Sequence, residues 1–304
     1  MSLSQPEGCG LRPIRRDDAA SVAALLDADE QVFGARSRLG AADVVAWWAR
    51  ADLELDSWLL EQDGRAAALG WVEDHEDLML GFGCVHPDAK GRRLGSWLAD
   101  RSEARAREKG RRAIRQFATA SDAAARTLFE SRGYREVRRF YELTIELGGE
   151  LPEPELPEGL SIDTFRPEDA RAWHAAASEA FEEEWGFDPL SFDEWWELRS
   201  KAPDFDPTVW FLVRDGGEIA ALARCDAGRR GGGSVGMLGV RRPWRRRGLG
   251  LALLRHAFRE FRRRGYERVS LGVDAQNPTG ATRLYERAGM SVDAEYVTFE
   301  RELQ

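Results

Sequence analysis

Residues 240–250 read VRRPWRRRGLG, and this stretch decides the fold because it separates two different hydrophobic periods. The segment before it, SVGMLGV at 234–240, is an apolar run of strand length. The segment after it, 249–264, carries apolar residues three and four positions apart, which is typical of an amphipathic helix. We therefore predict a strand, a loop rich in arginine and glycine, and a helix.

A loop of this kind in front of a helix predicts a phosphate site. The first turn of a helix has N–H groups without partners and a partial positive charge, so it attracts phosphate oxygens. Glycine lets the backbone come close to those oxygens, and arginine adds charge with forked donors. The sequence has no GxxxxGK[ST] pattern, so a P-loop nucleotide site is not expected. The expected site comprises Leu238, Gly239, Val240, Arg245, Arg246, Arg247, Gly248, Leu249 and Gly250.

Two other interpretations of this loop stay open. It is a solvated basic turn that only caps the helix, or its arginines bind the phosphate backbone of a nucleic acid. Against a nucleic acid, the whole chain has a formal net charge of -9. The arginines in question are Arg241, Arg242, Arg245, Arg246 and Arg247, with Trp244 as the aromatic residue among them.

The same pattern occurs twice in the chain. GFGCVHPDAKGRRLG at 81–95 parallels GMLGVRRPWRRRGLG at 236–250, and SDAAARTLFESRGY at 121–134 parallels NPTGATRLYERAGM at 277–290. The offset is 155 residues between Gly95 and Gly250, and 156 between Phe129 and Tyr285. An offset this steady indicates two copies of one domain.

The segment GGELPEPELPEG at 148–159 separates the copies. Its prolines stiffen the chain and its glutamates repel one another, as in an extended linker. We predict a first domain at 1–149, a linker at 150–159 and a second domain at 160–304. Strands and helices alternate in both copies, so the expected fold is α/β, with a mixed central sheet flanked by helices.

Turn residues and periodicity give the expected elements. Gly216 and Gly217 predict a hairpin turn, and Pro167 suits the first turn of a helix. The strands expected in the second copy are 159–163, 209–215, 218–226, 234–240 and 268–274 with a closing strand pair through 303, and the helices are 167–181, 191–201, 249–264 and 278–288. In the first copy we expect a helix at 95–109 and a strand at 113–119.

The loop also carries a resemblance to a known family. Arg245-x-x-Gly248-x-Gly250, which follows Val240, matches the R/Q-x-x-G-x-G/A signature of the GNAT acetyltransferases, and the chain resembles that family in both copies. The resemblance implies that each copy is a GNAT fold. It also implies that acetyl-CoA is the acyl donor and that no metal takes part.

A second landmark of the GNAT family is an asparagine before a helix that carries a tyrosine, and Asn277 and Tyr285 resemble it. The resemblance implies that Tyr285 protonates the departing CoA thiolate, or orients it. The alternative for Tyr285 is an aromatic side chain that only packs in the core. Asn277 either contacts the pantetheine arm or caps the helix, and capping is the simpler role.

The copies differ at the residues that carry this resemblance. In the first copy Lys90 stands at the arginine position, Arg93 at the first glycine and Phe129 at the tyrosine. A Cβ at residue 93 obstructs a phosphate, and phenylalanine has no proton to donate. We therefore expect a catalytic second copy and a degenerate first copy, which binds acetyl-CoA weakly or serves as a scaffold. The possible second site comprises Val85, Lys90, Gly91, Arg92, Arg93, Leu94 and Gly95.

The group that takes a proton from the acceptor is not evident from the sequence. Many GNAT enzymes carry a glutamate on the strand before the loop, but the strand 234–240 has no carboxylate. The candidates are Asp226, Asp274 and the run Glu182, Glu183 and Glu184, which act directly or through water.

The acceptor itself also stays open. The segment 181–189 combines acidic and aromatic residues and suits a cationic amine, unless it is a solvated helix end. The two-copy layout resembles that of the mycothiol synthases, which acetylate a cysteinyl-glucosaminyl-inositol amine. We expect a small-molecule amine as the acceptor. The alternatives are the amine of a protein or peptide, or a non-catalytic protein that binds acyl-CoA.

Composition argues against several other classes. Cys9, Cys84 and Cys225 show no CxxC spacing and the four histidines form no HxxxH pair, so neither a disulfide scaffold nor a metal site is expected. No apolar run reaches the roughly 18 residues that a membrane helix needs, and the N-terminus lacks the layout of a signal peptide. We therefore expect a cytoplasmic protein with no membrane or nucleic-acid partner.

Overall fold

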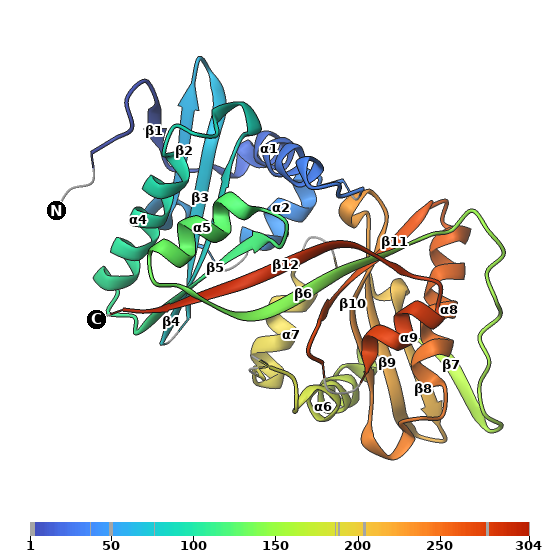
Figure 1. The fold of residues 1–304 in the computed structure, drawn as a ribbon. Coiled ribbons are helices and arrows are strands. Elements are labelled where there is room, and N and C mark those ends of the chain that lie inside the picture. The colour runs from blue at the N-terminus through green and yellow to red at the C-terminus, as the bar shows by residue number, and fades with distance from the viewer. Residues whose placement is uncertain are drawn as a thin grey trace. The chain divides into compact units, whose positions relative to one another are not determined.

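The computed structural model describes residues 4–36, 38–48, 51–75, 77–185, 187, 189–202, 205–277 and 280–303. They form two compact units that are built of strands and helices (Figure 1). The first unit contains Met1–Glu142, Asp274–Gln276 and Asp293–Gln304, and the second contains Leu143–Val273 and Asn277–Val292. Each unit therefore takes residues from both sequence copies, and one cut near residue 150 does not reproduce the division.

The first unit packs helices on a mixed sheet. Its elements are β1 (Gly10–Arg12), α1 (Ala19–Val32), α2 (Ala41–Trp47), α3 (Leu53–Asp56), β2 (Ser57–Gln62), β3 (Arg65–His75), β4 (Leu78–Val85), η3 (Pro87–Ala89), α4 (Leu94–Glu108), β5 (Ala113–Thr119), α5 (Ala123–Ser131) and β6 (Arg135–Glu146), with β12 (Ser291–Glu302). The strand order is β1-β2-β3-β4-β5-β12-β6. β4 and β5 run parallel, whereas β5 and β12 run antiparallel.

The second unit repeats this plan. Its elements are β7 (Leu160–Thr164), α6 (Ala170–Phe181), α7 (Phe192–Ser200), β8 (Trp210–Asp215), β9 (Glu218–Ala227), β10 (Gly233–Val240), η7 (Arg242–Trp244), α8 (Leu249–Arg263), β11 (Arg268–Asp274) and α9 (Ala281–Arg287). The order is β6-β11-β10-β9-β8-β7, with β10 and β11 parallel. β8 and β9 form the predicted hairpin at Gly216 and Gly217, and Gly216 adopts a φ of 57°.

The predicted α/β class with a mixed sheet is confirmed, and the expected elements of the second copy follow in the expected order. Two details differ. The helix expected at 278–288 is α9, which begins at Ala281, while positions 278 and 279 lie outside the described residues. The closing strand pair is wrong, because β12 runs as one strand from Ser291 to Glu302.

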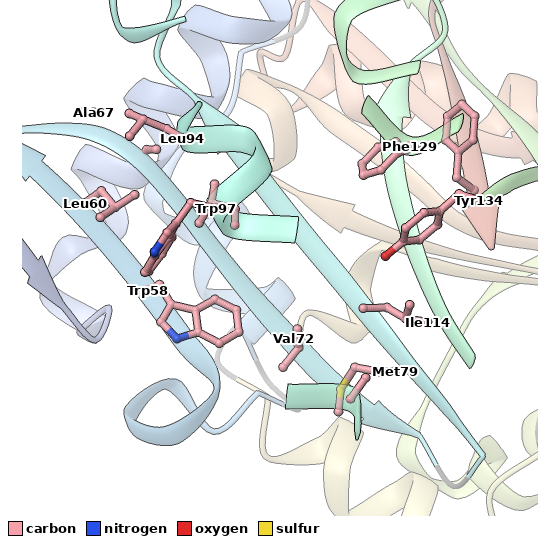
Figure 2. Packing of buried hydrophobic residues seen from close by; sticks show 14 of the residues in the cluster. Trp58, Leu60, Ala67, Val72, Met79, Leu94, Trp97, Ile114, Phe129 and Tyr134 are labelled. Carbon is pink, nitrogen blue, oxygen red and sulfur yellow. The ribbon is translucent and has the colours of Figure 1, made fainter. Parts of the chain in front are cut away.

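β12 explains why the first unit needs the end of the chain. Its residues pair with β5 from Tyr296 opposite Thr119 to Glu302 opposite Ala113. Val297 and Phe299 of β12 are fully buried in the hydrophobic core of the first unit. Figure 2 shows that core, to which β2 contributes Trp58 and Leu60, α4 contributes Leu94 and Trp97, and α5 contributes Phe129.

The helix α8, which follows the loop, is anchored in the core of the second unit. Five of its side chains, spaced at helical period, are fully buried: Leu253, Leu254, Ala257, Phe258 and Phe261. Burial of each large apolar side chain contributes about 1.5–3 kcal/mol. Its opposite face carries arginines, of which Arg262 and Arg263 lie in the last turn, where the helix dipole favours positive charge.

The predicted linker lies along that arginine face. Arg262 donates to the carbonyl of Gly149, Arg259 to that of Leu151 and Arg255 to that of Glu153, at 2.8, 2.9 and 3.2 Å. Leu151 is buried, with 6% of its surface exposed. The segment is therefore a strap fixed to α8 of the second unit.

Candidate functional site

The parallel strands β10 and β11 separate soon after they begin. Their ladder contains only the pairs Gly233 with Val269 and Ser234 with Ser270, whereas β10 stays paired with β9 as far as Val240. In the described part of the chain, the β11 side of β10 beyond Ser234 therefore presents main-chain groups that no strand uses. Such an edge can bind an extended chain through hydrogen bonds.

A β-bulge at Gly236 accompanies this separation, since the register with β9 shifts between Val235 and Met237. A Cβ on Gly236 would lie 2.8 Å from both Arg224 and Asp226 side-chain atoms, so a larger residue there would displace the ends of both side chains. Sequence analysis missed the bulge, although a glycine inside a strand pattern is a signal for one.

The loop after β10 has the geometry of an anion site. Arg246 and Gly248 adopt positive φ values of 63° and 84°. The first bond of the helix ladder runs from the N–H of Ala252 to the carbonyl of Gly248 at 3.0 Å, so the N–H groups of residues 249–251 have no carbonyl within the helix. A Cβ on Gly248 would meet no atom within 4 Å, which leaves room for a phosphate.

The three arginines of the loop differ in their contacts. Arg245 donates to the carbonyls of Val240 and Ala180 at 3.2 and 3.4 Å and pairs with Glu183 at 3.3 Å, so it holds the loop in shape. Arg247 lies 4.0 Å from Asp215. Arg246 is exposed and forms no ion pair within the described ranges, which leaves its guanidinium available for a phosphate.

The other predicted site residues act through packing. A Cβ on Gly239 would lie 2.8 Å from Phe181, and one on Gly250 would lie 3.0 Å from Leu284, so these glycines let α6 and α9 approach the strand and the helix. Leu249 is buried. The side chains of Leu238 and Val240 lie within 4.0 Å of the same position on Gly250.

Tyr285 of α9 is buried, with 7% of its surface exposed. Burial raises the pKa of its phenol to about 12, and the negative charge of Glu184 contributes to the rise. Its hydroxyl forms no hydrogen bond within the described residues, so it is free to serve a substrate. A phenol that stays protonated at neutral pH suits a proton donor.

Asn277 does not cap α9. The residue before the helix is Gly280, with a φ of 73° and no side-chain cap, so the predicted capping role is wrong. Instead, Nδ2 of Asn277 donates to Oε1 of Glu184 at 3.0 Å. Sequence analysis missed this contact because the two residues are 93 positions apart and no periodicity joins them.

The five candidate bases are not equivalent. Glu182 and Glu183 both pair with Arg242, at 3.3 and 3.0 Å. Asp226 is buried and lies 4.0 Å from Arg229.

Asp274 pairs with Arg138 at 2.7 Å and accepts from the N–H of Gln276 at 2.8 Å, all within the first unit. Among the five candidates, the structure connects Glu184 with both Asn277 and Tyr285.

The loop of the first unit has the same backbone. Gly91 and Arg93 take φ values of 83° and 60°, and the N–H of Trp97 donates to the carbonyl of Arg93 at 3.0 Å. A Cβ on Gly95 would lie 3.6 Å from Leu128 and 3.8 Å from Val85, as on Gly250 in the second unit. The first copy thus keeps the loop conformation without glycine at residue 93.

The side chains of that loop are engaged by the first unit itself. Lys90 lies 2.7 Å from Asp29 and 3.9 Å from Asp122, and 4.8 Å above the ring of Phe33. Arg92 donates to Gln62, and Leu94 is buried.

The rest of the aligned site also lacks features of the second unit. Phe129, which replaces the tyrosine, packs against Tyr134 and Phe299 at ring distances of 5.3 Å. β4 pairs with β3 in an unbroken register, so it has no bulge.

The described residues show neither a metal site nor a membrane-spanning helix. No group of three or more His, Cys, Asp or Glu side chains in them is arranged to hold a metal ion. None of their helices is both long and apolar enough to cross a membrane.

Comparison with known proteins agrees with this geometry. The model of the acetyltransferase (GNAT) family matches residues 22–134 and 170–290. The chain is 33% identical to the mycothiol acetyltransferase of Thermobispora bispora over 77% of this chain and 80% of the relative. It is 35% identical to the mycothiol acetyltransferase of Streptomyces coelicolor over 72% of this chain and 68% of the relative.

Solved structures give the same result. The GCN5-related N-acetyltransferase from Sphaerobacter thermophilus has a TM-score of 0.84 and 34% identity, and the match covers 98% of this chain and 97% of that one. A tandem GNAT protein from the clavulanic acid biosynthesis pathway has a TM-score of 0.73 and 18% identity, and the match covers 97% and 98% of the two chains, which shows the shared fold. The chain therefore belongs to the GNAT family of N-acetyltransferases, with two copies of the fold in tandem.

Proposed function

We propose that the second unit transfers an acetyl group from acetyl-CoA to the primary amine of a small molecule. The observation that carries this proposal is the combination of an anion-binding loop at Gly248 with the separated strands β10 and β11. A phosphate group, an extended amide chain and a thioester, in that order, are the parts of acetyl-CoA. The site offers helix N–H groups for the first and a free strand edge for the second.

The residues of the second unit divide the task. The N–H groups of Gly248, Leu249 and Gly250 and the guanidinium of Arg246 would bind the pyrophosphate. The main chain of Leu238, Gly239 and Val240 would bind the pantetheine arm. Tyr285 would protonate the thiolate that leaves when the amine attacks, which typically contributes a factor of about 10²–10⁴ to the rate.

The acceptor proposed for the first assay is the amine precursor of mycothiol. The support is the similarity to proteins named mycothiol acetyltransferase, at 32–35% identity over 68–79% of this chain. The absence of a carboxylate on β10 is the reason to test other primary amines beside it.

The first unit is proposed to be catalytically silent. Phe129 has no acidic proton, and Lys90 is paired with Asp29 where the second unit has the loop-shaping Arg245. Its role would be structural, because its sheet and core include the end of the chain.

Calorimetric titration of acetyl-CoA into wild type, Gly248→Glu and Arg93→Glu tests the proposal. Both substitutions place a carboxylate at the residue before a helix, at the same backbone conformation, so each controls for the other. We expect one binding site in wild type and in Arg93→Glu, and none in Gly248→Glu. Loss of binding in Arg93→Glu alone would move the donor site to the first unit, and no binding in wild type would rule out the proposal.

A further inference from the structure

The segment after α6 places one carboxylate near the proposed acid. Glu184 is held in a turn by two backbone hydrogen bonds, one from its N–H to the carbonyl of Phe181 at 2.8 Å and one from the N–H of Phe187 to its own carbonyl at 3.2 Å. From this turn, its Oε1 accepts the hydrogen bond from Nδ2 of Asn277 at 3.0 Å. The backbone and the side chain of Glu184 are therefore both positioned.

A second observation is independent of that hydrogen bond. Tyr285 is more than nine-tenths buried, and its hydroxyl has no hydrogen-bond partner within the described part of the chain. The pKa of this phenol is raised first by burial and then by the charge of Glu184. A carboxylate that disfavours the phenolate in this way lies in the same small region as the hydroxyl.

The two neighbouring glutamates, Glu182 and Glu183, are both engaged by arginines. The guanidinium of Arg242 lies within 3.3 Å of both Glu182 and Glu183, and Glu183 also pairs with Arg245. An arginine beside a carboxylate favours its charged form and makes it a weaker base. Glu184 accepts from the amide of Asn277, and its charge is the one of the three that acts on the pKa of Tyr285.

We propose that Glu184 accepts the proton that the acceptor amine must lose, and that Asn277 is the positioning residue that orients it. This inference rests on the function proposed above, and it supplies the base that β10 lacks. It also names the substrate class, which is a primary amine that arrives as an ammonium ion, because a carboxylate attracts that form. Trp185, the next residue, is 40% exposed, and a tryptophan ring is a favourable neighbour for a cation.

The protons and bonds balance in this scheme. The ammonium nitrogen carries three protons, and the amide product keeps one of them. One proton passes to Glu184 and then to water, which frees the nitrogen to attack the carbonyl carbon of the thioester. The C–N bond forms, the C–S bond breaks, and Tyr285 gives its proton to the sulfur. The second nitrogen proton returns to the Tyr285 oxygen, so one proton is released for each amide formed.

The first test is an NMR titration of the full chain labelled with carbon-13 at the tyrosine Cζ atoms. The chain has five tyrosines, and Tyr285→Phe assigns the signal of interest. Glu184→Gln keeps an oxygen for Asn277 but removes the charge, so the pKa of Tyr285 is expected to fall. Glu182→Gln is the matched control from the same turn and is expected to leave it unchanged. An unchanged Tyr285 pKa in Glu184→Gln overturns the proposal without any activity measurement.

The second test is kcat/KM against pH, measured as thiol release from acetyl-CoA with glucosamine, spermidine or lysine methyl ester. Glu184→Gln is expected to lose at least about 10²-fold in kcat/KM together with the acidic limb of the profile. Glu182→Gln keeps both. Asn277→Ala is expected to keep the limb but move it to higher pH, because the carboxylate loses a donor that favours its charged form.

The outcomes separate this proposal from the proposed function. A Glu184→Gln variant with the wild-type rate and limb shows that another group takes the proton. An Asn277→Ala variant that is slower by the same factor at every pH shows that Asn277 does not act through Glu184. Wild-type protein that binds acetyl-CoA and acetylates neither these amines nor the amine precursor of mycothiol contradicts the proposed function, and the Tyr285 titration then decides the place of Glu184 alone.

Discussion

Arg93 and Gly248 hold the same left-handed backbone conformation, with φ of 60° and 84°, at the residue that precedes α4 and α8. For a residue with a Cβ this conformation costs about 1–2 kcal/mol, and for glycine it costs nothing steric. The loop shape is therefore encoded by the surrounding contacts as well as by glycine. The first copy thus has an arginine where the second has glycine, and the two loops share one backbone conformation at this residue.

Arg93→Gly tests whether the residue at position 93 alone determines if the first unit binds acetyl-CoA. The variant is expected to bind a single acetyl-CoA per chain, as is expected of wild type, because Lys90 keeps its pairs with Asp29 and Asp122. Calorimetry gives the number of sites. Two sites in Arg93→Gly would show that the arginine side chain is the only obstacle in the first unit.

Tyr285→Phe tests the proposed acid. The substitution removes a hydroxyl without a protein partner in the described residues and leaves the ring in its buried place, so the fold and the Kd for acetyl-CoA are expected to stay unchanged. The rate constant kcat is expected to fall by about 10²–10⁴-fold. A kcat within about twofold of wild type would assign Tyr285 to packing alone.

The same tyrosine predicts a dependence of stability on pH. Its phenol has a folded pKa of about 12, raised from the ordinary value of 10.0 by burial. Stability from this group is therefore fully present below pH 10 and is lost as the pH rises through about 12. Tm is to be measured between pH 8 and 12 in wild type and in Tyr285→Phe. Wild type is expected to lose more, and equal slopes would show that the phenol titrates normally.

How far the sequence predicts this protein depends on the range of each interaction. The strand before the loop, the helix α8 and the hairpin at Gly216 follow from local period and turn residues, and all three were predicted. The place of β12 could not be predicted in this way. The alternation of apolar and polar residues in β12 predicts a strand. The local sequence around Val297 and Phe299, however, does not indicate that this strand pairs with β5.

The same limit applies to the candidate site. The loop residues could be proposed from the sequence because they are consecutive and carry a signature. The contact between Glu184 and Asn277 was missed, and the run of three glutamates looked uniform in sequence. Only packing distinguishes them, because Arg242 lies beside Glu182 and Glu183 and Asn277 beside Glu184.

The strap along α8 predicts a selective effect on the linker. Arg259 donates to the Leu151 carbonyl at 2.9 Å and lies 2.5 Å from Glu153, but it is partly exposed, so Arg259→Ala is expected to cost about 1 kcal/mol. Leu151→Ala removes a buried side chain and is expected to cost about 2–4 kcal/mol.

Proteolysis after glutamate measures the release of this strap. Cleavage between residues 150 and 158 is expected to be slow in wild type and faster in both variants. The exposed Lys201→Ala serves as a control elsewhere on the second unit, since its contact is an exposed pair with Glu197. Cleavage as fast in wild type as in Leu151→Ala would mean that the strap is detached in solution.

We predict that the end of the chain, strand β12, stabilises the first unit, although the residues just before it in the sequence belong to the second unit. Phe299 is 1% exposed and packs against Phe129 at a ring distance of 5.3 Å, so Phe299→Ala is expected to cost about 3–5 kcal/mol. Hydrogen exchange of β5 and α5 should accelerate, because β12 pairs with the whole of β5.

Val292→Ala on the same strand is the control, since Val292 is 47% exposed and surface changes cost within about 0.5 kcal/mol. Faster exchange confined to α8 and β10 in Phe299→Ala would contradict this pairing, and a fragment of residues 1–149 that folds cooperatively on its own would show that β12 is dispensable.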